Sequence, residues 1–389
     1  MKRSILWLFC FATLTSVSAQ NSEENGQLKV SGYVQTQWKW DEAGVATGDQ
    51  NDFSIRRGRL KADYKNKFGQ VVFQVDVTES GVDIKDAYLK VPIPKAEWMA
   101  LRAGVFDRPF GYEISYSSSR RESPERSRVF QTLFPKERDL GVEIALKGKE
   151  GTILSDFSLN AGAFSGNGGQ AKETDSGKDF IGHLAYSKML KSVTFGLGAS
   201  FYYGGVRLAA EDTQLAYKIE NKEFVEDATL TPGEYADRHY WGLDGQLSFR
   251  SIAGKTNLRG EYLWGKQAGA AMGSKSPTGK ITSDIYLRNF SGYYIQLVHT
   301  IGQSRHSLVA KLDGYDPNTK LSGDECLTHG DVAYTTLGLG WLFQFNEQVR
   351  LTAYYEFNRN EKVRNDALSE SYGKDLSDDQ FTLRLQYKF

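Results

Sequence analysis

The sequence is poor in cysteine, in long apolar runs and in net charge, and each shortage excludes a class of protein. Cys10 and Cys326 are the only cysteines among 389 residues, too few for a disulfide framework. The low mean hydropathy excludes a bundle of membrane-spanning helices, each of which needs about 20 apolar residues. Because 48 basic side chains balance 48 acidic ones, the strong positive field of a nucleic-acid binder is missing, and we expect no nucleic-acid partner.

Aromatic residues, in contrast, are abundant. The chain contains 7 Trp, 21 Tyr and 22 Phe. A disordered chain would be poor in these residues, so the sequence indicates a folded protein. Its length leaves room for two or three ordinary domains or for one large one.

Residues 1–19 have the pattern of a secretory signal peptide. Two basic residues open the chain, an apolar stretch extends to Val17, and small residues precede Gln20. The alternative, a transmembrane anchor, is disfavoured because the apolar stretch is shorter than the width of a bilayer. Cleavage after residue 19 would remove Cys10, leave a net charge of −2 and leave Cys326 without a partner for an intrachain disulfide.

From Gln27 to Phe389 the recurring pattern has period two, which is typical of strands with one apolar and one polar face. The last segment, 381–389, shows it most clearly, because five apolar or aromatic residues alternate with four polar ones. We predict sixteen strands, at 27–40, 52–65, 69–78, 82–91, 97–106, 139–149, 155–165, 178–189, 192–206, 237–250, 255–267, 288–301, 304–313, 332–345, 349–360 and 378–389.

The connections between these strands alternate in length. They are short after every even strand and long after most odd ones, with 79–81 as the exception. An antiparallel meander places odd and even connections at opposite ends, so the two ends differ. Outer-membrane barrels show this asymmetry, because their periplasmic turns are short and their external loops are long. We therefore predict an all-β fold in the bacterial outer membrane: residues 20–389 form a single 16-stranded antiparallel transmembrane β-barrel.

In such a barrel the apolar strand faces contact outer-membrane lipid, and aromatic side chains gather at the two membrane interfaces. Aromatic residues near strand ends fit these girdles: Trp38, Trp40, Tyr202, Tyr203, Tyr240, Trp241, Tyr262, Trp264, Tyr293 and Tyr294. The alternative is a soluble β-sandwich or β-helix. It is disfavoured because a sandwich usually joins its strands by short turns at both ends.

The alternation also predicts which charged side chains face the lumen: Arg57, Arg59, Lys61, Asp63, Asp76, Arg102, Glu143, Lys147, Asp244, Arg259, Glu261, Lys311, Arg350, Glu356, Arg384 and Lys388. Their signs are mixed, and a solvated wall of mutually neutralising charges is one interpretation. Arg57, Arg59 and Lys61 are different, because like charges on one strand face repel unless an anion lies between them.

The loop at 107–138 is long, follows the fifth strand and has six basic and three acidic side chains between residues 120 and 138. Folded into the bore, it would narrow the channel and present guanidinium groups to phosphate or carboxylate oxygens. Alternatively, Glu122, Glu125 and Glu137 pair with neighbouring arginines and hold the shape of the loop. Both interpretations stay open, and both can hold together.

Five blocks of residues, in order, resemble the phosphate-selective porin O and P family. They are Phe53–Leu60, Phe73–Asp76, Lys85–Leu89, Arg102–Gly111 and Leu133–Val142. The resemblance is specific over about residues 50–145. It implies a sixteen-stranded porin that assembles as a homotrimer and has a constriction formed by the third external loop. It also implies phosphate selection by channel arginines and lysines, and the matching positions here are Arg57, Arg59, Arg102, Arg108 and Arg138.

We therefore expect a porin for passive diffusion of small hydrophilic solutes, with a preference for anions such as phosphate. The expected pore and anion-binding residues are Arg57, Arg59, Lys61, Arg102, Arg108, Arg120, Arg121, Arg126, Arg128 and Arg138. Expected partners are small anionic or polar solutes, outer-membrane lipid and the outer-membrane assembly machinery, which would recognise the strand ending at Phe389. The alternatives are a general or saccharide-accepting porin, an outer-membrane barrel enzyme and a surface-loop adhesin.

Catalytic and metal-binding motifs are not apparent. His183, His239, His299, His306 and His329 are scattered, and none has a second His or Cys at ligand spacing. The histidines also provide no motif for a Ser-His-Asp constellation. We expect no enzyme activity, no catalytic residue, no metal site and no cofactor.

Overall fold

The computed structural model describes residues 26–169, 171–209 and 214–389; the predicted signal peptide and its cleavage site lie outside them. The strands are β1 (Gln27–Asp41), β2 (Asn51–Asn66), β3 (Gly69–Thr78), β4 (Gly81–Ile93), β5 (Ala96–Asp107), β6 (Arg138–Lys147), β7 (Phe157–Phe164), β8 (Asp179–Leu190), β9 (Val193–Arg207), β10 (Ala216–Glu220), β11 (Glu223–Glu226), β12 (Tyr235–Ser251), β13 (Gly254–Gly269), β14 (Ile285–Ile301), β15 (His306–Asp316), β16 (Tyr334–Gln344), β17 (Val349–Asn360) and β18 (Gln380–Lys388). Short helices are α1 (Arg128–Leu133), α2 (Ser369–Tyr372), η1 (Glu42–Gly44), η2 (Gly323–Glu325) and η3 (His329–Asp331).

Sixteen of these strands form a closed antiparallel barrel, as predicted. Each of them pairs with its neighbours around the ring, and β1 closes it by pairing with β18, from Tyr33 opposite Lys388 to Asp41 opposite Gln380. Closure matters because every backbone N–H and C=O in hydrocarbon needs a partner. Among the described residues, no helix is both long and apolar enough to span a bilayer.

The predicted strands agree with the observed ones to within a few residues, but one hairpin was missed. β10 and β11 form a small hairpin inside the connection 208–234, and β10 also pairs in parallel with the start of β14. Its turn residues, Asn221 and Lys222, both have positive φ, as a two-residue hairpin turn requires. These strands span only five and four residues, so their alternation is too brief to predict.

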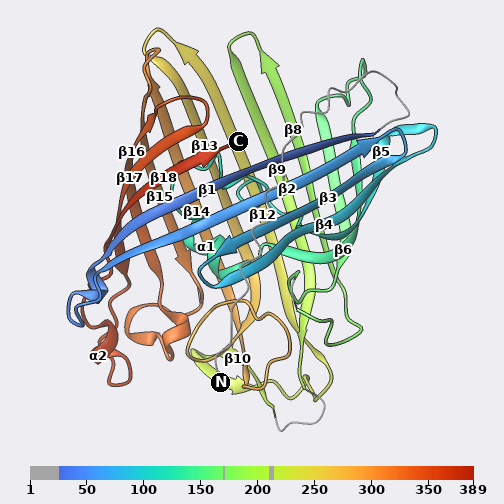
Figure 1. The fold of residues 1–389 in the computed structure, drawn as a ribbon. Coiled ribbons are helices and arrows are strands. Elements are labelled where there is room, and N and C mark those ends of the chain that lie inside the picture. The colour runs from blue at the N-terminus through green and yellow to red at the C-terminus, as the bar shows by residue number, and fades with distance from the viewer. Residues whose placement is uncertain (1–25, 170, 210–213) are drawn as a thin grey trace, which may run out of the picture.

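The two ends of the barrel differ as expected. The short connections 191–192, 252–253 and 345–348 lie at one end, at the top of Figure 1. The long connections, including 208–234 and the segment with α2, lie at the other end, at the bottom of the figure. The connection 79–80 is the short exception, as predicted.

The outer surface of the barrel is apolar, which confirms the period-two interpretation. Phe73, Leu197 and Ile295 are exposed, each pointing away from the lumen. Residues that point to the lumen instead, such as Asp76 and Gln296, are buried. An exposed apolar belt of this kind is stable in contact with acyl chains, as in other outer-membrane barrels.

The expectation for the aromatic girdles was wrong for three residues. Tyr203, Trp241 and Tyr262 are exposed on the outer face, but Tyr202, Tyr240 and Tyr294 are buried inside the lumen. The reason is the strand period itself: adjacent residues point to opposite faces, so only one residue of a directly adjacent pair, such as Tyr202 and Tyr203, can meet lipid.

Two bulges change the alternation near the start of the barrel. At β2, Gln35 pairs with Arg57 and Thr36 with Ile55, so Arg56 is an extra residue. At β4, Gln74 pairs with Asp86 and Val75 with Ile84, so Lys85 is extra. A bulge leaves its additional residue unpaired and re-aims its side chain. Both extra residues are basic.

Candidate functional site in the barrel lumen

The connection 108–137 between β5 and β6 lies inside the barrel and includes α1, which Figure 1 shows behind the front strands. The backbone N–H of Gly111 donates to Ser200 of β9 at 2.8 Å, and that of Arg128 donates to Asp313 of β15 at 3.1 Å. On the other side of the bore, Arg384 of β18 donates to the carbonyl of Pro124 at 2.7 Å. The loop is therefore bonded to walls that lie far apart in sequence. We call it the lumen loop.

The apolar side of the lumen loop packs against one wall. Its buried apolar residues are Phe110, Ile114, Val129, Phe130, Leu133 and Phe134. They contact inward side chains of β8, β9 and β12 to β15, namely Ile181, Tyr202, Tyr240, Leu263, Phe290, Tyr294 and Tyr315. Burial of so many large side chains is the main force that fixes the loop. The sequence did not predict this core, because a wet lumen leads one to expect polar inward residues.

The charged side of the lumen loop faces the opposite wall, and its centre is Glu125. This carboxylate accepts hydrogen bonds from Arg56 and Arg57 of β2, each at 2.8 Å, and from Arg384 of β18 at 3.0 Å. Burial alone would raise the pKa of Glu125, but the three arginines hold it well below its usual range. One negative charge thus contacts three positive ones. We call these four residues the Glu125 cluster.

Arg121 increases the positive excess near that cluster. Its side chain is buried, and none of its three guanidinium nitrogens has a hydrogen-bond partner among the described residues. Burial, together with the nearby charges of Arg126 and Arg57, lowers the pKa of Arg121 well below its usual value. A buried cation without a partner is costly, so this position favours the approach of an anion.

A second carboxylate, Glu137, joins the end of the lumen loop to β2. Arg126 and Arg138 contact Glu137, the former at 3.6 Å, and Arg59 approaches it to 4.0 Å. Arg59 also pairs with Asp76 at 3.2 Å, and Arg138 pairs with Asp86 at 3.1 Å. Three of the predicted residues, Arg59, Arg126 and Arg138, therefore meet at Glu137, but each of these cations has a carboxylate partner.

The remaining predicted residues have different surroundings. Lys61 pairs with Asp63 at 3.1 Å and Arg102 with Glu143 at 2.7 Å, both on strands. Arg108 is fully buried in an ion pair with Asp139 at 3.1 Å. Arg120 is exposed, and Arg128 lies over the ring of Tyr334 at 4.1 Å. The structure thus brings most of the ten residues to the lumen but does not bring them to a single point.

The acidic residues of the lumen loop bridge the loop to the wall as well as to its own arginines. Glu122 contacts Arg259 of β13, and Glu125 contacts β2 and β18. Of these three glutamates, only Glu137 also pairs with arginines close to it in sequence, Arg126 and Arg138. The interpretation that these glutamates hold the shape of the loop is therefore consistent with the contacts, although the wall supplies most of the partners.

The prediction did not include several basic residues that take part. Arg56 lies in the Glu125 cluster because of its bulge, which strict alternation does not anticipate. Arg384 was predicted to face the lumen but not as a site residue. Arg350 of β17 donates to the carbonyl of Arg121 at 2.9 Å. One signal in the sequence could have revealed Arg56. Phe53, Ile55 and Arg57 all occupy odd positions and would share one strand face, yet the first two are apolar and the third is basic. An extra residue between Ile55 and Arg57 puts them on opposite faces.

The other wall of the lumen carries acidic side chains. Glu261 of β13 accepts from the backbone N–H of Tyr112 at 2.8 Å, and Lys311 of β15 pairs with Glu113 of the loop at 3.0 Å. Asp244, Asp313 and Glu356 also lie on strands β12 to β17. These strands also carry Arg259, Lys311 and Arg350 at the loop, and Glu356 lies on β17 beside β18, so the acidic groups are interspersed with basic ones.

A closed sixteen-stranded barrel with an apolar outer face, and with a loop bonded across its charged lumen, defines a channel of the outer membrane. The sequence agrees: this chain belongs to the phosphate-selective porin O and P family, whose sequence profile matches residues 28–389. The chain is therefore an outer-membrane channel for passive diffusion. Its family and fold point to a channel rather than to an enzyme.

Solved structures share the fold at low sequence identity. Salmonella typhi OmpF, in complex with daunomycin, aligns with a TM-score of 0.59 at 13% identity, over 93% of this chain and 97% of that one. The channel DcaP of Acinetobacter baumannii aligns with a TM-score of 0.56 at 12% identity, over 96% of this chain and 100% of that one. Vibrio cholerae OmpT, in its trimer form, aligns with a TM-score of 0.55 at 10% identity, over 94% of this chain and 100% of that one. No curated protein is significantly similar in sequence.

Proposed function

We propose that this porin conducts small hydrophilic solutes with a preference for anions such as phosphate. The observation that carries the proposal is the Glu125 cluster. Three arginines share one carboxylate there, and Arg121 lies nearby without a partner among the described residues. The excess of positive charge attracts anions, and planar guanidinium groups hold phosphate oxygens in pairs.

Within this proposal the ten predicted residues, together with Arg56 and Arg384, have unequal roles. Arg56, Arg57, Arg121 and Arg384 set the local positive potential. The approach on β2, β5, β6 and the lumen loop is lined by Arg59, Lys61, Arg102, Arg120, Arg126 and Arg138. Arg108 and Arg128 hold the loop in place, because one is fully buried in an ion pair and the other packs on an aromatic ring. The lumen loop itself acts as the constriction.

A second candidate, a general or saccharide-accepting porin without phosphate selectivity, is favoured by the opposite wall. Asp244, Glu261 and Asp313 add negative charge there, and Tyr112 and Tyr116 stack with ring centroids 5.3 Å apart on the loop. Opposed charges orient any dipolar solute and select less strongly by sign. Liposome swelling with sugars, compared with block of the current by phosphate, separates the two candidates.

Assembly follows from the same proposal. We infer a homotrimer embedded in outer-membrane lipid, consistent with the trimer form described for Vibrio cholerae OmpT. The strand ending at Phe389 is the segment that the assembly machinery would recognise. Chemical crosslinking of the protein in native outer membranes tests the subunit number, with a three-subunit product expected and a monomer as the contrary result.

Reversal potentials in planar bilayers under a potassium chloride gradient test the anion preference. We expect the wild-type potential to lie on the anion side and the Arg56→Gln/Arg57→Gln variant to move toward zero. Glu356→Gln is the matched control, because removing a carboxylate of β17, the strand beside β18, is expected to strengthen the anion preference. Cation preference in the wild type would remove the proposal and leave the channel in place.

A further inference from the structure

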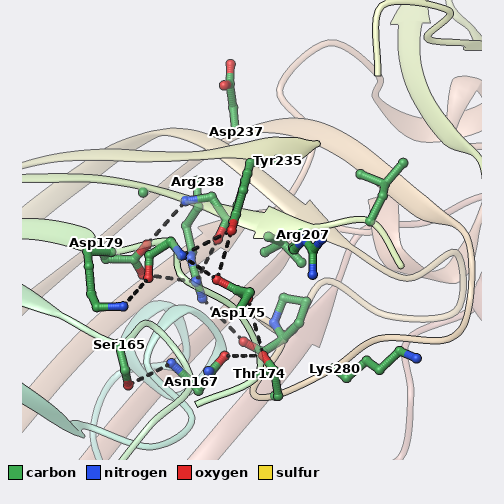
Figure 2. A pocket seen from close by; sticks show the side chains of 18 of the residues that line it. Ser165, Asn167, Thr174, Asp175, Asp179, Arg207, Tyr235, Asp237, Arg238 and Lys280 are labelled. Atoms are coloured by element: carbon green, nitrogen blue, oxygen red, sulfur yellow. Dashed lines mark hydrogen bonds and ion pairs between the residues drawn. The ribbon is translucent and has the colours of Figure 1, made fainter. Parts of the chain in front are cut away.

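A pocket at the rim of the barrel lies apart from the lumen network. It has a volume of about 430 Å³ and is bounded by the loop 165–178, by the ends of β8, β9 and β12 and by the segment 277–280. These connections belong to the end with long loops. Figure 2 shows Asn167, Thr174 and Asp175 beside one another in this pocket, with Arg207 and Lys280 nearer its other side. We call it the rim pocket.

The carboxylates of the rim pocket already have donors within the protein. Asp179 pairs with Arg238 at 3.0 Å and accepts a hydrogen bond from the hydroxyl of Tyr202. Asp175 accepts from the hydroxyl of Tyr235 at 3.0 Å, and Asp237 accepts from Lys266. The charges of Asp179 and Asp237 are therefore compensated by cations, whereas Asp175 is held by the neutral donors Tyr235 and Gly177.

Two buried donor atoms of the rim pocket, in contrast, lack an acceptor among the described residues. Asn167, which is 7% exposed, has no partner for its Nδ2 atom among the described residues, and Arg238, which is 4% exposed, has none for its Nε atom. Arg207 is exposed and donates its Nε–H to the carbonyl of Gly233, and within the described part of the chain no carboxylate pairs with it. Lys280 adds a second cationic side chain at the edge. The unmatched Nδ2 atom of Asn167 and Nε atom of Arg238 call for a ligand rich in acceptor oxygens.

One wall of the rim pocket is a flat aromatic surface. The rings of Tyr203 and His239 stack with centroids 4.3 Å apart and an angle of 12°. Tyr203 is 61% exposed and points away from the lumen, so this surface is accessible from outside the barrel. Rings that combine an apolar face with a polar edge suit ligands that do the same, as a sugar ring does.

We propose that the rim pocket binds an anionic sugar, meaning a saccharide that carries a phosphate or carboxylate group. Arg207 and Lys280 meet the anionic group, Asn167 donates to sugar hydroxyls, and the ring of Tyr203 covers one sugar face. The volume of the pocket lies in the usual range for small-molecule sites. Because none of these residues belongs to the Glu125 cluster, the site is independent of the anion preference of the pore.

Calorimetric titration of the full chain in detergent micelles tests this site, with glucose 6-phosphate, glucose and inorganic phosphate as probes. We expect glucose 6-phosphate to bind at least tenfold more tightly than either of the others, because only it supplies both the anion and the sugar ring. The Arg207→Gln/Asn167→Asp variant should lower that affinity at least tenfold and leave the reversal potential unchanged. Arg207→Lys should restore part of the loss, since it keeps the charge.

The lumen variant Arg56→Gln/Arg57→Gln is the matched control, because it should change the reversal potential and leave the calorimetric affinity intact. Equal affinities for glucose and glucose 6-phosphate, or an affinity that the Arg207→Gln/Asn167→Asp variant does not change, would overturn the site. Arg207 is exposed but Asn167 is buried, so electrophoretic mobility with and without heating is used to verify that the double variant folds.

The ligand has two sources that share this chemistry, a free solute at the channel mouth and the headgroup of a membrane glycolipid. Repeating the titration in phosphatidylcholine vesicles with and without lipid A distinguishes them. Competition by lipid A assigns the site to the headgroup, and an unchanged affinity assigns it to the free sugar phosphate. Both results require that the pocket binds the anionic sugar.

Discussion

At the scale of single residues, Glu125 decides how the lumen loop meets the basic wall. It is the only carboxylate that contacts Arg56, Arg57 and Arg384 in the described residues, and about three-quarters of its side chain is buried. Removing one partner from a buried ionic cluster leaves the others uncompensated. The positive charge that attracts an anion is therefore tolerated only because Glu125 is ionised.

Glu125→Gln should lower the free energy of unfolding by about 3 kcal/mol, because three arginines lose their shared counter-charge. It should also strengthen the anion preference. Thermal denaturation and reversal potentials measure the two effects. A variant as stable as the wild type would show that the cluster does not hold the loop.

The pH dependence of this effect follows from the lowered pKa of Glu125. In an unfolded chain this carboxyl protonates near its ordinary pKa of about 4.3. Its contribution to stability is therefore complete above that pH and falls as the pH drops toward the lower folded value. We expect the difference in melting temperature between wild type and Glu125→Gln to stay constant from pH 7 to pH 5 and to shrink in more acidic buffer.

At the scale of elements, the sequence predicted the strands far better than it predicted the side chains that pack inside the barrel. The sixteen strands, their order and the unequal connections all follow from period-two alternation and turn spacing. The bulge at Arg56 was hidden, because one extra residue disturbs the alternation without breaking the strand. The hairpin of β10 and β11 was hidden by its shortness.

The lumen core was hidden for a different reason. Tyr202, Tyr240 and Tyr294 have the same local pattern as aromatic residues that meet lipid, and strand period gives the two faces without saying which one is inside. Only the contact with Phe130 and Phe134 of the lumen loop fixes the face. A contact between segments more than 60 residues apart has no signal in one sequence. The Glu125 cluster was partly missed for the same reason.

The packing of α1 on β14 depends on a glycine. A Cβ atom at Gly292 would lie 2.5 Å from a methyl group of Val129, so only glycine lets the helix approach this strand. Gly292→Val should displace α1 and loosen the lumen loop. We expect noisier single-channel currents and a lower melting temperature, while the barrel itself still assembles.

Gly245→Ala is the matched control for this substitution. It lies on β12, which β13 separates from β14, and an added Cβ there would meet only a side chain of Leu197 at 3.8 Å. Its currents and melting temperature should match those of the wild type. Quiet currents in Gly292→Val would mean that the contact of α1 with β14 does not fix the loop.

At the scale of the whole molecule, one arrangement links sequence, stability and transport. The apolar face of each strand meets lipid, and the polar face lines a lumen that the loop divides into a packed apolar side and a charged side. The closed ring of strands allows the apolar faces to meet lipid. The apolar contacts of the loop and the Glu125 cluster allow the loop to divide the lumen, because they hold charged groups at fixed places in the bore.

Cysteine labelling of two adjacent residues tests this arrangement most directly. Leu60 is exposed on the outer face of β2, and Lys61 beside it faces the lumen, so a water-soluble anionic thiol reagent should reach only the second position. With Cys326 replaced by alanine, we predict that the reagent lowers the single-channel current of Lys61→Cys and leaves that of Leu60→Cys unchanged. Equal labelling at both positions, or a current that neither label changes, would contradict a barrel with a wet, charged interior.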